Sequence, residues 1–218
     1  MNKFLSSSIG RKVAMALSAL FLIIFLIIHL AVNLTSLFSA AIFNEASHFM
    51  GTNPLIQFIM QPILMFGVVF HFVMGFVLEI KNKSARSVGY VNYKGAANAN
   101  WMSRNMVFSG AVILIFLAIH FLDFWIPEMK YRYVEFLPSD PNRYFTELQE
   151  KFSETWRVSL YVLGFVFLAL HLLHGFQSSF QSMGWNRYQK CIKTTGKIYA
   201  IVIPLGFIII ALYHYFNH

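Results

Sequence analysis

Long apolar runs separated by short polar segments dominate the chain. Five of them have about 20 residues or more, at about 12–36, 56–80, 105–126, 157–181 and 197–216. Because a helix rises about 1.5 Å per residue, each run can cross a hydrocarbon core of about 30 Å. Only a helix satisfies its own backbone hydrogen bonds in lipid, and these runs lack the alternation of barrel strands. The pattern predicts an all-α integral membrane bundle of five transmembrane helices, with 1–218 as a single membrane domain.

The first run follows a basic segment, as the apolar part of a secretory signal does, and Ser39-Ala40-Ala41 resembles a cleavage site. Its apolar stretch from Val13 to about Thr35 is longer than 20 residues. Signal peptides have about 7–15 apolar residues at this place. We therefore interpret the run as the first transmembrane helix.

Composition supports a lipid environment. Hydrophobic residues make up 57% of the chain and charged residues 12%, against roughly 45–50% and 25% in soluble domains. A net charge of +8 would suggest nucleic acid in a soluble protein, but the basic residues here cluster beside the apolar runs. We expect the lipid bilayer and no nucleic acid as a partner. Cys191 is the single cysteine, which excludes an intramolecular disulfide and a cysteine-based zinc or iron–sulfur site in this chain.

The basic residues are distributed unequally between the two sides of the predicted bundle. Twelve lie on the side of the N-terminal tail and of the second and fourth loops: Lys3, Arg11, Lys12, Lys81, Lys83, Arg86, Lys94, Arg104, Arg187, Lys190, Lys193 and Lys197. Five lie on the other side: Lys130, Arg132, Arg143, Lys151 and Arg157. The positive-inside rule predicts a cytoplasmic N-terminus and an outside C-terminus. The acidic third loop, 127–156, is expected to form an extracytoplasmic cap, and Trp101, Trp125, Trp156 and Trp185 an aromatic belt near the span ends.

Four of the predicted helices each carry one histidine at depth: His29, His71, His120 and His171. Ionisable residues within a bilayer are rare and usually mark function. A lone histidine there is often only a hydrogen-bond partner between helices, but four in a common pattern favour a binding site. His29 follows Lys12 by 17 residues and His120 follows Arg104 by 16. Both therefore lie about 25 Å from the cytoplasmic boundary, at an outer level.

The other two histidines fall at an inner level. His71 precedes Glu79 by eight residues, which is about 12 Å from the cytoplasmic boundary, and His171 follows Arg157 by 14, about 21 Å in from the outer one. Each level receives one histidine from each of two like-oriented helices. Two imidazoles on opposite faces of a flat ring are the axial ligands of bis-histidine haem. The sequence thus predicts two haem b groups, with all four histidines as ligands of haem iron.

Several residues have alternative interpretations. His174 can replace His171 as a ligand or hydrogen-bond a haem propionate or quinone. The remaining three histidines, His48, His214 and His218, are interpreted as surface residues at the outer end. Small residues occur near the histidine positions on their helices: Gly67, Gly75, Gly164, Gly175, Ser18 and Ser109. They either leave space for a flat ring or serve close helix packing alone.

The chain resembles, over nearly its whole length, the single-chain, five-helix, di-haem cytochrome b subunit of succinate dehydrogenase and quinol:fumarate reductase. The resemblance rests on the opening segment Ser7-Ser8-Ile9-Gly10-Arg11-Lys12, on His29 followed four residues later by Asn33, and on one histidine in each of the next three helices. His171 with Gly175 is similar to the family's His-x-x-x-Gly element, which favours His171 over His174. The chain departs from the family at Val32, where the family has glycine.

By this resemblance, His29 and His120 hold the distal haem and His71 and His171 the proximal haem. The chain would be the electron-transfer and quinone-reactive subunit of a respiratory oxidoreductase, with no succinate-oxidising site of its own. Its partners would be a flavoprotein subunit and an iron–sulfur subunit on the cytoplasmic face, and a membrane quinone, menaquinone in most di-haem members. Its place would be the bacterial cytoplasmic (inner) membrane, as a multi-pass protein.

The resemblance also suggests roles for charged residues. Glu45, 26 residues before His71, is a candidate catalytic proton acceptor for the quinone, although a solvated loop charge is an equal interpretation. Arg11, Arg104 and Arg187 either pair with haem propionates or only set the orientation.

Two other classes of function remain open. One is the di-haem cytochrome b subunit of a hydrogenase or nitrate reductase, in which ligand histidines tend to pair within fewer helices. The other is a histidine-lined metal or proton transporter, which normally also needs intramembrane carboxylates and broken helices.

Overall fold

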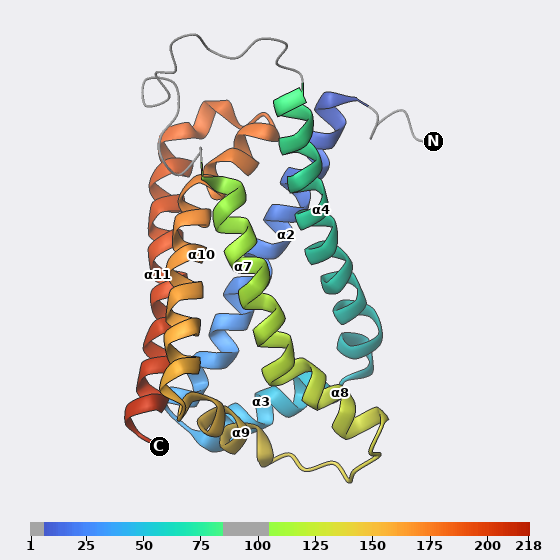
Figure 1. The fold of residues 1–218 in the computed structure, drawn as a ribbon, viewed down its shortest axis with the longest axis vertical. Helices are drawn as coiled ribbons and strands as arrows, with labels where there is room; N and C mark the ends of the chain where they lie inside the picture. Colours follow the sequence, from blue (N-terminus) through green and yellow to red (C-terminus); the bar gives the residue numbers. More distant parts are fainter. Residues whose placement is uncertain (1–6, 85–104) are drawn as a thin grey trace.

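The computed structural model describes residues 7–84 and 105–218, and all regular structure in these two ranges is helical (Figure 1). The longest helices are α2 (Ser8–Leu34), α4 (Gln61–Ser84), α7 (Met106–His120), α10 (Thr155–Ser182) and α11 (Gln189–Phe216). With the short helical turns that continue them, they form five segments long and apolar enough to cross a membrane. The prediction of an all-α bundle with five such helices is confirmed. Of the residues invoked above, Lys3, Arg86, Lys94, Trp101 and Arg104 lie outside the described ranges.

Three predicted span boundaries were wrong. The third span does not end before Pro127: it continues through a π-helical turn (Phe121–Trp125) into α8 (Ile126–Tyr133). Pro127 follows the π turn, where the regular i→i−4 ladder of α7 is already interrupted. A second π turn (Ile56–Met60) precedes α4, which extends to Ser84. The fifth span begins at Gln189 rather than at about 197, because its first turns are polar and hydropathy does not register them.

The predicted outer loops are largely helical. A 3-10 turn (Thr35–Leu37) leads into α3 (Ala40–Thr52), whose N-cap Ser39 accepts a hydrogen bond from the Ile42 N–H. Between α8 and α10 lies α9 (Arg143–Phe152). Asn44 joins α3 to α9, because its amide donates to the Asn142 carbonyl (3.0 Å) and accepts from the Phe145 N–H (2.7 Å). We call the end of the bundle formed by α3, α8 and α9 the capped end.

Charged side chains hold the capped end together. The Arg143 guanidinium pairs with Glu128 and Glu147 and lies 4.1 Å above the Tyr131 ring. Burial raises the pKa of the Tyr144 phenol. Its hydroxyl therefore stays protonated and can donate to Glu128 Oε1, 3.4 Å away. These contacts join α8 to α9.

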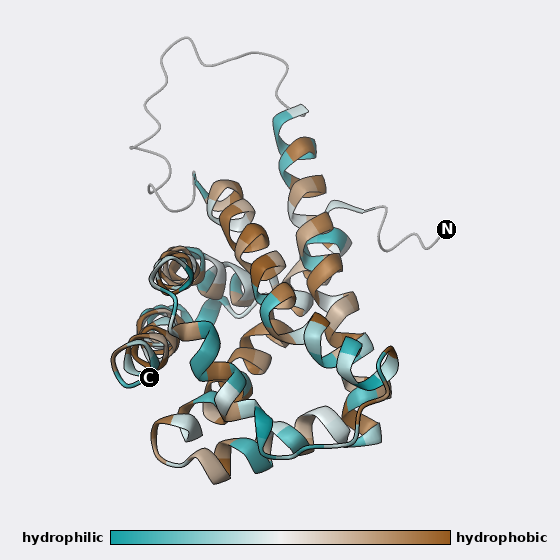
Figure 2. Cartoon of the chain, turned by 60° about the horizontal axis from the view of Figure 1, so that its bottom comes forward, coloured by the Kyte–Doolittle hydropathy of each residue, from teal (hydrophilic) through white to brown (hydrophobic). Residues whose placement is uncertain are grey.

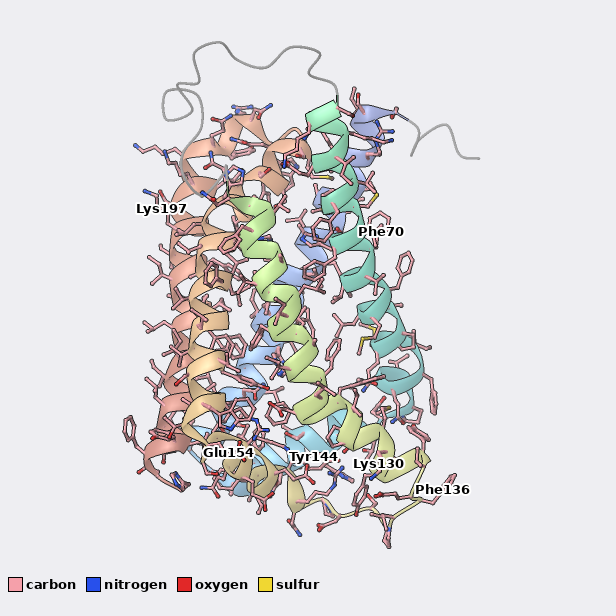
Figure 3. The ribbon with its side chains drawn as sticks, viewed as in Figure 1. Phe70, Lys130, Phe136, Tyr144, Glu154 and Lys197 are labelled. Carbon is pink, nitrogen blue, oxygen red and sulfur yellow. The ribbon has the colours of Figure 1, made fainter. Side chains whose placement is uncertain are left out.

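The opposite end carries the start of α2, the end of α4 and the 3-10 turn Asn186–Tyr188 that precedes α11 (Figure 1). We call it the basic end, and its described cations are Arg11, Lys12, Lys81, Lys83, Arg187, Lys190, Lys193 and Lys197. Figure 3 places Lys197 toward this end, and Lys130, Phe136, Tyr144 and Glu154 at the capped end. Figure 2 shows hydrophobic residues along the long helices.

The long helices pack unequally. α10 lies against α11, α7 and α2, whereas α4 contacts α2 and α7 (Figure 1). Of the α4 residues, all of which are described, only Gly67 is buried. The other side chains of α4 therefore face outward or line the space between α4 and its neighbours. Because lipid is as apolar as leucine, association of α4 depends on close contacts and polar side chains.

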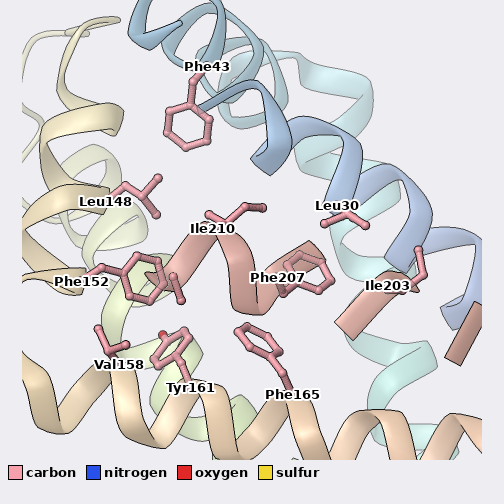
Figure 4. Close-up of a cluster of buried hydrophobic side chains, with 11 residues drawn as sticks. Leu30, Phe43, Leu148, Phe152, Val158, Tyr161, Phe165, Ile203, Phe207 and Ile210 are labelled. Atoms are coloured by element: carbon pink, nitrogen blue, oxygen red, sulfur yellow. The ribbon is translucent and has the colours of Figure 1, made fainter. Parts of the chain in front are cut away.

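The main buried cluster lies on the inner side of the capped end, where α3 and α9 meet α10 and α11 (Figure 4). Tyr161 is 1% exposed and meets the Phe152 ring edge to face, at 5.2 Å between centroids. Phe165 stacks on Phe207 at 5.3 Å, which joins α10 to α11. Such aromatic pairs add about 0.5–1.5 kcal/mol each beyond the area they bury. The cluster makes this half of the bundle the better packed one.

A buried ion pair fixes α7 against α10. Asp123, in the π turn, is 6% exposed, and its Oδ1 lies 3.2 Å from Arg157 Nε. The Tyr161 hydroxyl donates to Asp123 Oδ2 at 2.9 Å. A buried charge is tolerated only when it is paired and hydrogen-bonded. The π turn, which shifts the helical register after His120, is therefore held by a specific polar contact.

Replacing Asp123 with Asn should lower the free energy of unfolding by about 1–3 kcal/mol, because it removes the buried carboxylate that Arg157 Nε faces and leaves the guanidinium only its pair with Glu154. Chemical unfolding of the purified chain in detergent measures this. Glu79→Gln is the matched control, since its pair with Lys83 is exposed and should contribute about 0–1 kcal/mol. Equal losses in the two variants would show that the Asp123 pair is not a buried anchor.

Candidate cofactor site: two histidine pairs

The outer histidines lie together. The rings of His29 on α2 and His120 at the end of α7 have centroids 5.8 Å apart, with planes at 83°. Phe25 stacks on His29 at 5.2 Å, and Phe116 stacks on His120 at 5.9 Å. Tyr161 completes the surroundings of His120 at 6.1 Å. This pair therefore lies in an aromatic environment next to the main buried cluster.

The inner histidines form a second pair. His71 on α4 and His171 on α10 have ring centroids 6.3 Å apart, with planes at 69°. Each is close to a serine hydroxyl of a neighbouring helix. Ser18 Oγ lies 3.1 Å from His71 Nδ1, and Ser109 Oγ lies 3.2 Å from His171 Nδ1. This pair is therefore in a more polar environment than the outer one.

The structure pairs the four histidines as their predicted depths along the helices indicate. His29 meets His120, and His71 meets His171. His171, rather than His174, is the α10 histidine whose ring contacts His71. The role of these residues as iron ligands stays a prediction, because a ring contact between two imidazoles does not by itself identify what they bind.

The two serines do not accompany the histidines of their own helices. Ser18 and His29 share a face of α2 but are 11 residues apart, or about 16 Å along the axis. Ser18 therefore contacts the inner level, and Ser109 does the same on α7. A sequence shows that two residues share a helix face, but the neighbouring helix at that depth decides which histidine each one meets.

The glycines divide into two kinds. A Cβ on Gly67 would lie 3.0 Å from the Phe21 ring, and one on Gly164 would lie 2.5 Å from Phe116 Cδ2. At these positions the missing side chain admits a phenylalanine of the next helix, which is the close-packing interpretation. A Cβ on Gly175 would instead meet Met106 Cε at 3.2 Å, the flexible end of a side chain, and His171 Cδ2 at 3.9 Å. Gly110, which the sequence did not single out, also borders this ring, with 3.7 Å to His171 Cε1.

Other candidate residues lie away from the pairs. Glu45 is on α3 at the capped end, in a helix rather than in the expected loop, and is exposed. Arg187 is exposed at the basic end, where Arg11 is partly buried. His48 is also on α3, with its ring 6.2 Å from that of Tyr144.

The prediction of His214 as a surface residue was wrong. Its side chain is 0% exposed, and its Nε2 lies 3.0 Å from Ser36 Oγ. α11 runs to Phe216 and packs against the 3-10 turn that follows α2, so the face of α11 that carries His214 is covered. Hydropathy near the end of a span does not reveal such cover. His218, in contrast, is exposed as predicted.

The geometry of the pairs fits two axial ligands of one metal. A metal–imidazole nitrogen bond is about 2.0–2.1 Å, and a ring nitrogen lies about 1.1 Å from the ring centroid. Two opposed ligands therefore have centroids about 6.3 Å apart, which the 6.3 Å of the inner pair matches, and the outer pair, at 5.8 Å, is slightly closer. His120 Nδ1 is also buried without a hydrogen-bond partner among the described residues. In the same ranges, no group of three or more His, Cys, Asp or Glu is placed to hold a metal ion.

Comparison with known proteins does not add to this assignment. No protein-family model matches the chain, and neither the curated proteins nor the solved structures contain a significant match.

Replacing Gly164 with Ala should lower the free energy of unfolding by about 1–3 kcal/mol, as overpacking does. The added methyl would clash with the Phe116 ring, which stacks on His120. Unfolding in detergent, followed by circular dichroism, measures the change. Gly75→Ala is the control, because its Cβ would meet only Met15 Cε at 3.7 Å, an ordinary contact. A Gly164→Ala protein as stable as Gly75→Ala would contradict the packing.

Proposed function

We propose that this chain is the membrane-anchor cytochrome b subunit of a succinate:quinone oxidoreductase. In this role it carries electrons through two bis-histidine haem b groups, between an iron–sulfur partner and a membrane quinone. The observation that carries the proposal is the arrangement of four histidines from four helices as two ring pairs, with centroids 5.8 and 6.3 Å apart. These separations suit two ligands on opposite sides of one iron.

Each part of the site has a distinct task in this proposal. Bound haem would supply a one-electron redox centre at each level. His29 and His120 would hold the outer group, and His71 and His171 the inner one. Phe25 and Phe116, which stack on the outer histidines, exclude water and keep the local dielectric low. Burial of this kind is one of the means by which a protein sets a haem potential.

The charge distribution supports an orientation and a docking face. The inner pair lies toward the basic end and the outer pair toward the capped end. By the positive-inside rule the basic end faces the cytoplasm. The flavoprotein and iron–sulfur subunits would dock there, so that electrons pass between the inner haem and the iron–sulfur centre. The membrane would be the bacterial cytoplasmic membrane.

The quinone, menaquinone in this proposal, would react near the outer haem at the capped end. Glu45 is exposed on α3 at this end, where a carboxylate can exchange protons with solvent. It is the proposed proton acceptor. In this proposal the partner subunits carry out the succinate chemistry.

Replacement of single histidines tests the pairs. The purified chain should show two low-spin haem b centres with separate midpoint potentials. His29→Ala and His120→Ala should each remove one of them, and His71→Ala and His171→Ala the other, as measured by redox titration of the visible spectrum. His174→Ala is the matched control on α10 and should retain both centres. Wild-type protein without haem b would overturn the proposal, and loss of the same centre in both sets would overturn the pairing.

Co-purification tests the complex. Mild solubilisation of tagged chain from its native membrane should recover a flavoprotein and an iron–sulfur protein, with quinone-linked succinate or fumarate activity. Recovery of hydrogenase or nitrate reductase subunits would instead assign the chain to the alternative di-haem class. Isolation as a haem-free chain that transports metal ions or protons would favour the transporter.

A further inference from the structure

Two serines have the same hydrogen-bond geometry on two different helices. Ser18 Oγ donates to the Met15 carbonyl at 2.8 Å and lies 3.1 Å from His71 Nδ1. Ser109 Oγ donates to the Met106 carbonyl at 2.9 Å and lies 3.2 Å from His171 Nδ1. Each serine is thus bound to the backbone three residues earlier and to one histidine of the inner pair.

The contact distances favour one tautomer of both histidines. A hydroxyl has one proton, and the backbone carbonyl is the nearer acceptor of each serine, at 2.8 and 2.9 Å against 3.1 and 3.2 Å to the imidazole. With the serine proton on the carbonyl, the histidine Nδ1 carries a hydrogen and donates it. A neutral imidazole has one N–H, so Nε2 keeps a bare lone pair in both His71 and His171. Neither ring has a proton left for the other, although their centroids are 6.3 Å apart.

The outer pair is different. His120 Nδ1 is buried and has no hydrogen-bond partner within the part of the chain that the structure describes. The contacts around His120 are aromatic, with Phe116, Phe124 and Tyr161 at 5.3–6.1 Å between centroids. The two levels therefore surround the same residue type with different polar contacts.

We propose that Ser18 and Ser109 are positioning residues that present the Nε2 atoms of His71 and His171 to the inner haem iron and lower its midpoint potential. This inference rests on the proposed function. An acceptor at Nδ1–H fixes the tautomer and ring orientation of a ligating histidine and increases its basicity. A more basic ligand stabilises the ferric state more than the ferrous state. The serines act only on the inner level, so they make the two centres unequal.

Two other serines provide matched controls. Ser36 Oγ donates to the Asn33 carbonyl at 2.7 Å and contacts His214 Nε2 at 3.0 Å, but His214 belongs to neither pair. Ser179 is buried on α10 and donates to the Phe176 carbonyl at 2.8 Å. Ser36→Ala and Ser179→Ala therefore each remove a buried hydroxyl that donates to a backbone carbonyl three residues earlier, at a position outside both histidine pairs.

The experiment is a redox titration of the full chain in nanodiscs, with the inner centre defined as the one that His71→Ala removes. Ser18→Ala and Ser109→Ala should each shift this centre to higher potential, the double variant should shift it further, and the outer centre should not move. The electron paramagnetic resonance signal of the inner centre should change as well, because the ring orientation is no longer fixed. Ser36→Ala and Ser179→Ala should leave both centres unchanged.

Two conservative variants of Ser18 distinguish loss of the hydroxyl from loss of folding. Ser18→Thr retains the hydroxyl and Ser18→Val has nearly the same shape without it. The Thr variant should keep the wild-type potential, whereas Val should shift it upward or lose the inner haem alone. Equal behaviour of Thr and Val, an equal shift in Ser179→Ala, or a shift of the outer centre would overturn the inference. Failure of the proposed function is a separate result, because wild-type protein would then contain no haem b.

Discussion

In hydrocarbon every polar group must find its partner within the chain, and most of this structure follows from that constraint. The backbone meets it by forming long helices. The side chains meet it locally: serine hydroxyls donate to carbonyls of their own helix, and Asp123 lies between Arg157 and Tyr161. The histidines meet it only in part. His120 Nδ1 has no partner in the described ranges, and the serine contacts leave Nε2 of His71 and His171 as bare acceptors. Unmet capacity at three of the four paired imidazoles inside an apolar bundle is what a metal cofactor would satisfy.

The bundle has more buried contacts near the capped end than along α4. Aromatic stacking, the Asp123 pair and the ionic contacts of α8 and α9 all lie toward one end. α4 has one buried residue and carries His71. The outer pair is therefore positioned by packing, whereas the inner pair also makes hydrogen bonds to Ser18 and Ser109. A chain that holds two copies of one cofactor can give them different properties in this way, because only the surroundings of the ligands differ.

Several features follow from sequence because they depend on local chemistry and on helix geometry. Apolar length gives the five helices, and a fixed rise of about 1.5 Å per residue places His29 with His120 and His71 with His171. The sequence determines the ends of the membrane-spanning helices less well than it determines their number. The polar start of α11 and the passage through Pro127 into α8 are invisible to hydropathy, because a helix can continue through polar residues and beyond the apolar run that hydropathy detects.

The sequence by itself determined that the chain is a five-helix bundle with four histidines at two depths, since both properties follow from composition and spacing along single helices. The tertiary structure decided the contacts between helices. In the fold, Ser18 and Ser109 contact the inner histidines rather than the outer ones. His214 is buried against Ser36, and Phe116 lies against Gly164. Rotation and offset between packed helices set these contacts, and neither quantity is a property of one segment alone.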